Sequence, residues 1–367
     1  MGDPRTVNLA QILVNYSIDV QKNDWVLIWS SIQALDLALE VQRYVLRAGG
    51  NPTMMFEDEA EQEVLFREGS DAQIQWVSPL TKQLIKEVDA LIRLKATTNT
   101  RALNGVDPKK QKLYQQARQE FMQTYMQRAA TGDLRWVLTQ YPCPAYAQEA
   151  DMSLKEFEDF VYAAVFADQP DPIAHWRAIH DEQQRLIDWL KGKKHVHARG
   201  PNSDLQLSIA DRVWINSDGH KNMPSGEIYT GPVEDSANGW VRFTYPAISN
   251  GRSVEGVALT FKDGKVVDAS AEKNEAFLLE MLDSDPGARY LGEFAIGTNY
   301  GIQRFTKSIL YDEKIGGSMH MAVGAGYPET GSKNVSSIHW DFICDMRDDS
   351  EILVDGELFY KNGKFMV

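Results

Sequence analysis

The chain has 367 residues, 43% hydrophobic and 25% charged, a composition typical of globular proteins with two or three domains. Its 52 acidic and 38 basic residues give a net charge of −14, which excludes nucleic acid as the main partner because phosphate binding needs a basic surface. Two distant cysteines, Cys143 and Cys344, exclude a thiolate zinc site and a disulfide framework and favour a reducing, cytoplasmic location. No apolar run resembles a signal peptide or spans a bilayer, so we expect no membrane partner.

Residues 1–190 alternate strand and helix patterns, which predicts an N-terminal α/β domain with an open parallel sheet and flanking helices. We expect a polar helix over about 108–128 and a later helix that begins at a capping box formed by Ser153 and Glu156. No glycine-rich phosphate loop occurs, which argues against a nucleotide-binding protein. The strand patterns lie at 24–29, 52–56, 88–94 and 134–138.

Residues 191–367 have a different pattern, with short alternating strands joined by turns, and we place a domain boundary at residues 190/191. Strand patterns at 205–209 and 240–244, and hairpin turns at 262–265 and 361–364, predict a C-terminal α+β domain rich in antiparallel strands. One helix is expected around 272–282.

His339 and Asp341 lie in a strand-like segment, SIHWDFI at 337–343. Successive strand residues point to opposite faces, so both polar side chains share one face while Trp340 points to the other. An imidazole and a carboxylate side by side suit a divalent cation, although a His–Asp hydrogen bond would satisfy the same two groups.

We interpret the five histidines other than His320 and His339 as surface or structural residues: His175, His180, His195, His197 and His220.

Three further candidate ligands have distinctive surroundings. His320 is flanked by glycines, which permit close backbone approach. Glu293 is a lone acid in an apolar segment, where it needs a partner or a metal. Glu227 follows a Pro/Gly turn, with Glu234 and Asp235 as rival ligands nearby.

This set is rich in carboxylates and contains two imidazoles and no thiolate, so it suits zinc, cobalt or manganese. A single catalytic zinc needs about three protein ligands, and a two-metal centre accounts for the surplus. The sequence contains neither HExxH nor GxSxG, which argues against a thermolysin-type site and a serine hydrolase.

The C-terminal motifs resemble those of the thermophilic metallo-aminopeptidases, a family that includes aminopeptidase T, aminopeptidase S and PepS and is also described as a type of leucyl aminopeptidase. The resemblance rests on MPSGEIYTGP at 223–232, GEFAIGTN at 292–299, DEKIGGSMH at 312–320 and IHWD at 338–341. It implies that a pair of divalent ions (zinc, cobalt, manganese or magnesium) generates a hydroxide that removes the N-terminal residue from peptides. It also implies a homodimer with an enclosed site.

The resemblance assigns roles residue by residue. It places the catalytic tyrosine on Tyr327 and a further acidic residue, a ligand or a general base, on Glu313. The metal-ligand positions that it implies are Glu227, Glu293, His320, His339 and Asp341.

Two alternatives stay open at this point. The chain could be another metal-dependent dipeptidase or amidohydrolase, which the dependence of turnover on peptide length would separate from an aminopeptidase. It could also be a non-catalytic peptide- or metal-binding protein that has kept the ligands, although a degenerate site is expected to have lost some of them.

Overall fold

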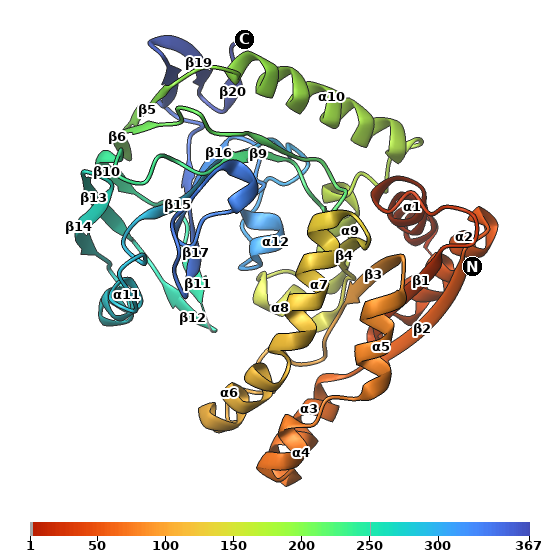
Figure 1. Cartoon of the computed structure of the whole chain (residues 1–367). Coiled ribbons are helices and arrows are strands. Elements are labelled where there is room, and N and C mark those ends of the chain that lie inside the picture. The colour runs from red at the N-terminus through yellow and green to blue at the C-terminus, as the bar shows by residue number, and fades with distance from the viewer. Residues whose placement is uncertain (1–2, 250) are drawn as a thin grey trace. The chain divides into compact units, whose positions relative to one another are not determined.

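The computed structural model describes residues 3–249 and 251–367, which form two compact units (Figure 1). The first unit runs to residue 173 and adds residues 219–224, and the second comprises residues 174–218 and 225–367. Helix α10 (Pro172–Leu190) begins at the end of the first unit and belongs mostly to the second. The domain boundary at residues 190/191 stays a prediction. No helix in the described ranges is both long and apolar enough to cross a membrane.

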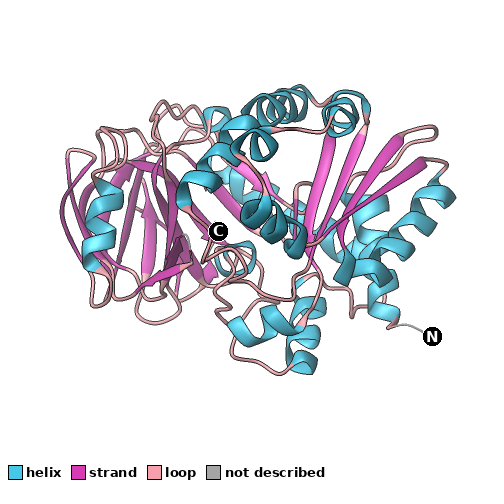
Figure 2. Cartoon of the chain, turned by 90° about the horizontal axis from the view of Figure 1, so that it is seen from below, coloured by secondary structure: helices cyan, strands magenta, loops and turns pink. Residues whose placement is uncertain are grey.

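The first unit is built on a five-stranded parallel sheet of order β2-β1-β3-β4-β8, which confirms the predicted open parallel sheet. Its strands are β1 (Trp25–Ser31), β2 (Asn51–Glu57), β3 (Ala90–Lys95), β4 (Arg135–Gln140) and β8 (Asn222–Met223). Helices lie on both sides of these strands (Figure 2). On one face, Leu84 and Ile85 of one helix pack against Leu27 and Leu91 of the strands, because alternate strand residues point to the same side.

The helices of the first unit agree with the predictions in part. The capping box of Ser153 and Glu156 is present and begins α9. The single helix expected over 108–128 is instead two helices that meet at Arg118, whose guanidinium stacks on the Tyr114 ring. The helices are α1 (Pro4–Ile12), α2 (Leu35–Ala48), α3 (Glu59–Glu68), α4 (Asp71–Gln75), α5 (Pro79–Glu87), α6 (Pro108–Ala117), α7 (Gln119–Thr131), α8 (Pro144–Glu149) and α9 (Leu154–Ala164).

The second unit contains two antiparallel sheets that share one hydrophobic core. The large sheet has the order β14-β13-β10-β6-β5-β18-β19-β20, and the predicted hairpins at 262–265 and 361–364 join its outer strands. Its strands are β5 (His195–Gly200), β6 (Ser203–Ser208), β10 (Asn238–Arg242), β13 (Ala258–Lys262), β14 (Lys265–Ser270), β18 (Glu351–Val354), β19 (Glu357–Lys361) and β20 (Lys364–Phe365). Two short helices, α11 (Glu275–Leu282) and α12 (Ile309–Asp312), and the ribbon β11 (Ala247–Ser249)–β12 (Arg252–Val254) complete the unit.

The small antiparallel sheet, of order β17-β16-β15-β9-β7, positions the candidate site. Its strands are β7 (Ile215–Ser217), β9 (Glu227–Thr230), β15 (Leu291–Gly297), β16 (Ser318–Gly324) and β17 (His339–Asp345). One face is apolar and enters the shared core through side chains such as Phe294, Met321 and Phe342. The predicted fold class, an α/β N-terminal half and a C-terminal half rich in antiparallel strands, is therefore confirmed.

Candidate metal centre

The second face of the small antiparallel sheet brings the candidate ligands together. Strand register places Ala322 of β16 directly between Glu293 of β15 and Asp341 of β17. Two residues from Ala322 along β16, His320 pairs with Ala295 of β15. Two residues further along β15, Gly297 pairs with Glu227 of β9. The residues that pair with the ligands on this face are alanine and glycine, so no large side chain separates the ligands there.

His339 is held in an orientation that suits a metal ligand. Its Nδ1 lies 2.7 Å from the carbonyl oxygen of Ala325, so Nδ1–H donates there and Nε2 is the atom left to bind a metal once it gives up its proton. That Nε2 atom lies 3.2 Å from a carboxylate oxygen of Glu293 and 3.4 Å from Oδ1 of Asp341. Fixing the imidazole through its second nitrogen is the usual way in which proteins prepare a histidine ligand.

Glu293 connects the two imidazoles. Its carboxylate faces His339 on one side, and its Oε1 lies 3.6 Å from Nε2 of His320 on the other. Burial alone would raise the pKa of Glu293, but the two imidazoles outweigh it and lower the pKa to about 2. Despite burial, the acidic neighbours in turn raise the pKa of His320 to about 9 and that of His339 to about 11. The carboxylates thus attract positive charge strongly enough to protonate both imidazoles when no metal competes.

Glu227 enters from the edge of the same cluster. Its Oε2 lies 3.3 Å from Nε2 of His320, and its side chain is almost fully buried. The preceding residue, Gly226, has φ +112°, and a Cβ atom added to it would lie 2.6 Å from Cβ of Asn299. Asn299 donates from Nδ2 to the carbonyl of Ser225 at 2.9 Å, which fixes the turn before Glu227. The Pro/Gly turn noted in the sequence therefore sets the orientation of the Glu227 side chain.

Glu313 arrives from a loop that crosses the sheet. A Cβ atom on Gly297 would stand 2.3 Å from the carbonyl oxygen of Ile315, so glycine is required for this segment to lie directly on the strand. Next to Glu313, the side chain of Lys314 is fully buried, pairs with Glu313 and lies 3.6 Å from Oε1 of Glu227. Burial alone would lower the pKa of Lys314, but Glu227 and Glu313 outweigh it and raise the pKa above its usual range.

These side chains form two groups, each with three donor atoms within 4.8 Å of one another. One group is Glu293, His339 and Asp341, and the other is Glu313, His320 and Asp341. Asp341 belongs to both. Among the described residues, three buried atoms of the cluster have no hydrogen-bond partner: Glu227 Oε2, Asp341 Oδ1 and His320 Nδ1. Buried polar atoms without partners are costly, and an oxygen- and nitrogen-binding divalent cation fits this donor set.

Tyr327 lies at the mouth of the cluster and is 38% exposed. Its hydroxyl is 3.4 Å from Nε2 of His339, and its ring contacts that of Tyr229 with centroids 5.4 Å apart. Burial of much of the ring and the charges of Glu293 and Asp341 raise the pKa of Tyr327 far above its ordinary value. The hydroxyl therefore keeps its proton and can donate it in a hydrogen bond.

The rival candidates have other partners. Glu234 accepts hydrogen bonds from Arg212 at 2.7 Å and from the backbone N–H of Lys333 at 2.6 Å, and it lies outside both donor groups. Among the described residues, Asp235 also lies outside both donor groups.

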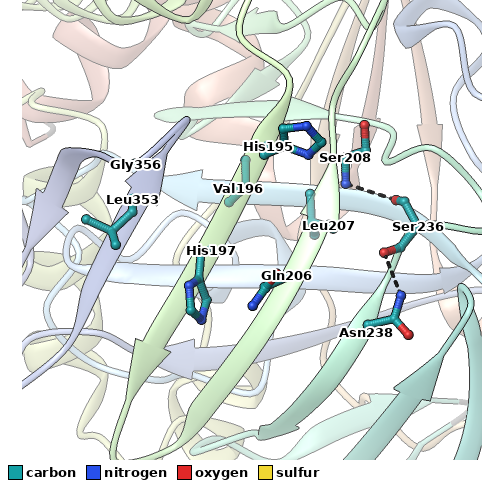
Figure 3. A pocket seen from close by; sticks show the side chains of 10 residues that line it. All are labelled: His195, Val196, His197, Gln206, Leu207, Ser208, Ser236, Asn238, Leu353 and Gly356. Carbon is teal, nitrogen blue, oxygen red and sulfur yellow. Dashed lines mark hydrogen bonds between the residues drawn. The ribbon is translucent and has the colours of Figure 1, made fainter.

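The other histidines make local contacts. His180 pairs with Asp218 at 2.6 Å, and the His220 ring packs on Tyr16. His195 and His197 line a pocket on the large antiparallel sheet (Figure 3), where His197 Nε2 lies 2.7 Å from Asp204. None of these four residues, nor His175, belongs to either donor group among the described residues.

Comparison with known proteins identifies the family. The family described as thermophilic metalloprotease (M29) matches residues 3–365. The chain belongs to this family. The membership confirms the resemblance seen in the motifs and makes the chain a metal-dependent hydrolase of peptide bonds.

Relatives resemble the chain over most of its length. It is 28% identical to aminopeptidase 2 of Geobacillus stearothermophilus, an alignment that covers 97% of this chain and 94% of the relative. It is 26% identical to aminopeptidase T of Thermus thermophilus, over 88% of this chain and 84% of the relative. The solved structure of wild-type AmpT from Thermus thermophilus has the same fold, with a TM-score of 0.87, 21% identity and 99% coverage of both chains.

Three residues of the cluster were not predicted from the sequence as part of the site. Lys314 and Asn299 lie inside the quoted motifs, but only the fold brings them against Glu227. Tyr229 follows Glu227 by two positions, and period-2 alternation in β9 was the available signal that both face the same side.

Proposed function

We propose that this metal-dependent aminopeptidase acts through two divalent ions, which two donor groups that both include Asp341 would hold. The observation that carries the proposal is the pair of donor groups that overlap in Asp341. Glu293, His339 and Asp341 would hold one ion; Glu313, His320 and Asp341, with Glu227 adjacent, would hold the other. When bound, such a pair supplies Lewis acidity and a hydroxide nucleophile at neutral pH.

The protein's own residues orient these donors and the substrate. The Ala325 carbonyl fixes His339 through Nδ1, and Asn299 fixes the turn that carries Glu227. The Tyr327 hydroxyl, which keeps its proton, is placed to donate a hydrogen bond to the oxyanion as the scissile carbonyl is attacked. Glu313 acts as a ligand in this assignment, because it belongs to one of the two donor groups.

The substrates are peptides, and we propose that they must carry a free N-terminal amine. A cluster with four carboxylates, Glu227, Glu293, Glu313 and Asp341, favours a positively charged or metal-binding amine at its mouth. Zinc, cobalt, manganese and magnesium are the candidate ions, since the donors are oxygens and imidazole nitrogens. We further propose a homodimer, on the family resemblance alone, and a cytoplasmic location, to which the two free, buried cysteines lend support.

The test compares peptide pairs on metal-stripped protein. A chelator removes bound ions, and zinc, cobalt, manganese or magnesium is added back singly before leucine p-nitroanilide and a series of peptides of two to six residues are offered. We expect turnover only after an ion is restored, at every peptide length, and none on the same peptides with an acetylated N-terminus. Turnover confined to dipeptides would indicate a dipeptidase, and equal turnover of acetylated peptides would exclude an aminopeptidase.

A further inference from the structure

Lys314 is a buried cation that belongs to the candidate centre but is not one of its ligands. Its side chain is 0% exposed, and its ammonium pairs with Glu313 and lies 3.6 Å from Oε1 of Glu227. A buried lysine is stable only when carboxylates compensate the loss of hydration, and here both compensating carboxylates stand at the same end of the cluster.

The other end of the cluster has no comparable cation. Within residues 3–249 and 251–367, Glu293 and Asp341 form ion pairs only with imidazoles, those of His320 and His339. An imidazole can release its proton and become a ligand, whereas an ammonium has no lone pair while it stays charged. Lys314 therefore places an ammonium beside Glu313 and Glu227, and among the described residues no lysine or arginine pairs with Glu293 or Asp341.

We propose that Lys314 is a positioning residue that makes the two ion positions unequal. The ion held by Glu293, His339 and Asp341 binds first and tightly. The ion held by Glu313, His320 and Asp341 binds second and exchanges readily. The inference rests on the proposed two-ion function.

Two physical effects produce this difference. Glu313 cannot offer its full negative charge to an ion, because the same carboxylate also compensates the ammonium of Lys314. The ammonium would also repel a divalent cation held by Glu313, because screening by water is weak at a buried site. Before any ion binds, however, Lys314 holds the Glu227 and Glu313 carboxylates in place against their mutual repulsion. The residue thus pre-forms the second position while keeping its affinity low.

The test measures stepwise affinities and uses cobalt(II) alone as the probe. Metal-stripped wild-type protein is titrated by calorimetry and by the visible absorption of cobalt, and two steps are expected whose Kd values differ at least about tenfold. Lys314→Met keeps the length of the side chain and removes the charge. In this variant the second Kd should fall about tenfold or more, while the first changes less than about threefold.

A second measurement does not depend on the variant folding. Wild-type crystals that contain one equivalent of cobalt per chain should show anomalous density between Glu293, His339 and Asp341 first. Equal Kd values in the wild type, or first occupancy beside Glu313, would overturn the inference and leave the two-ion function standing. Failure to bind cobalt at all would overturn the proposed function, and the inference with it.

Discussion

The assignment of faces on β16 can be tested with two neighbouring residues. Ala322 points toward the candidate ions, between Glu293 and Asp341, and Val323 points into the shared core of the second unit. Both side chains are fully buried, so burial alone does not distinguish them. We predict that Ala322→Val impairs metal binding and that Val323→Ala impairs stability.

The magnitudes follow from what each change adds or removes. Ala322→Val adds two methyl groups where the ligand oxygens converge, and overpacking of this kind costs about 1–3 kcal/mol. If that cost falls on metal binding, the Kd for cobalt rises about fivefold to 150-fold. Val323→Ala removes two methyl groups, each contributing about 0.8 kcal/mol, and leaves a cavity, which together lower the free energy of unfolding by about 2–3 kcal/mol.

The assay pairs urea unfolding of metal-stripped protein with calorimetric titration of cobalt. We expect Val323→Ala to bind cobalt within about twofold of the wild type, since its change lies on the opposite face of the strand. Ala322→Val should leave the stripped protein within about 1 kcal/mol of wild-type stability, because no ion is there to be displaced. The reverse pattern, with metal binding lost in Val323→Ala and retained in Ala322→Val, would show that the proposed face does not carry the ions.

Three more predictions concern the same centre. Tyr327→Phe should lower kcat about 10²- to 10³-fold, because the oxyanion loses a hydrogen-bond donor. Steady-state kinetics measures kcat, and metal analysis should find the cobalt content unchanged. An unaltered kcat would show that Tyr327 takes no part in the reaction. Because the pKa values of His320 and His339 are raised to about 9 and about 11, both imidazoles hold protons at pH 7, so metal loading should release at least these two protons. Unfolded histidines lose their protons near pH 6.5, so the stability of the metal-free protein should fall as pH rises from about 6.5 to 11. Calorimetry in buffers of different ionisation enthalpy counts those protons, and a count near zero would contradict the assigned ligands. Asp285 accepts hydrogen bonds from the Ser337 backbone N–H at 2.7 Å and from the side chains of Ser336 and Ser337. Asp285→Asn should therefore loosen the segment before His339 and weaken cobalt binding several-fold. Full wild-type affinity for cobalt would show that these hydrogen bonds are dispensable.

The sequence predicted the elements that carry a clear period. Strand patterns predicted β1 to β4 of the parallel sheet and β6 and β10 of the large antiparallel sheet, and the hairpin turns at 262–265 and 361–364 join the strands as expected. The helices α3 and α4 were missed because each buries a single side chain, Phe66 or Ile74, and so shows no helical stripe. The division at Arg118 was missed because the residues on both sides favour helix and only tertiary contacts select the break.

The ligand residues were also accessible from the sequence, but their relations were not. Period-2 alternation predicted that His339 and Asp341 share a face of β17. That Asp341 belongs to two donor groups depends on the pairing of three strands that are distant in sequence. The proximity of Lys314 to Glu227 depends on a loop that lies on Gly297, and no local pattern reports such a contact.

The most direct test of the two-ion centre is the anomalous diffraction of crystals saturated with cobalt or zinc, recorded at the absorption edge of that metal. We predict two peaks about 3.5–4 Å apart, with the carboxylate of Asp341 between them, Glu293 and His339 beside one, and Glu313 and His320 beside the other. A single peak at saturation, or two peaks that do not share Asp341, would contradict the proposed centre.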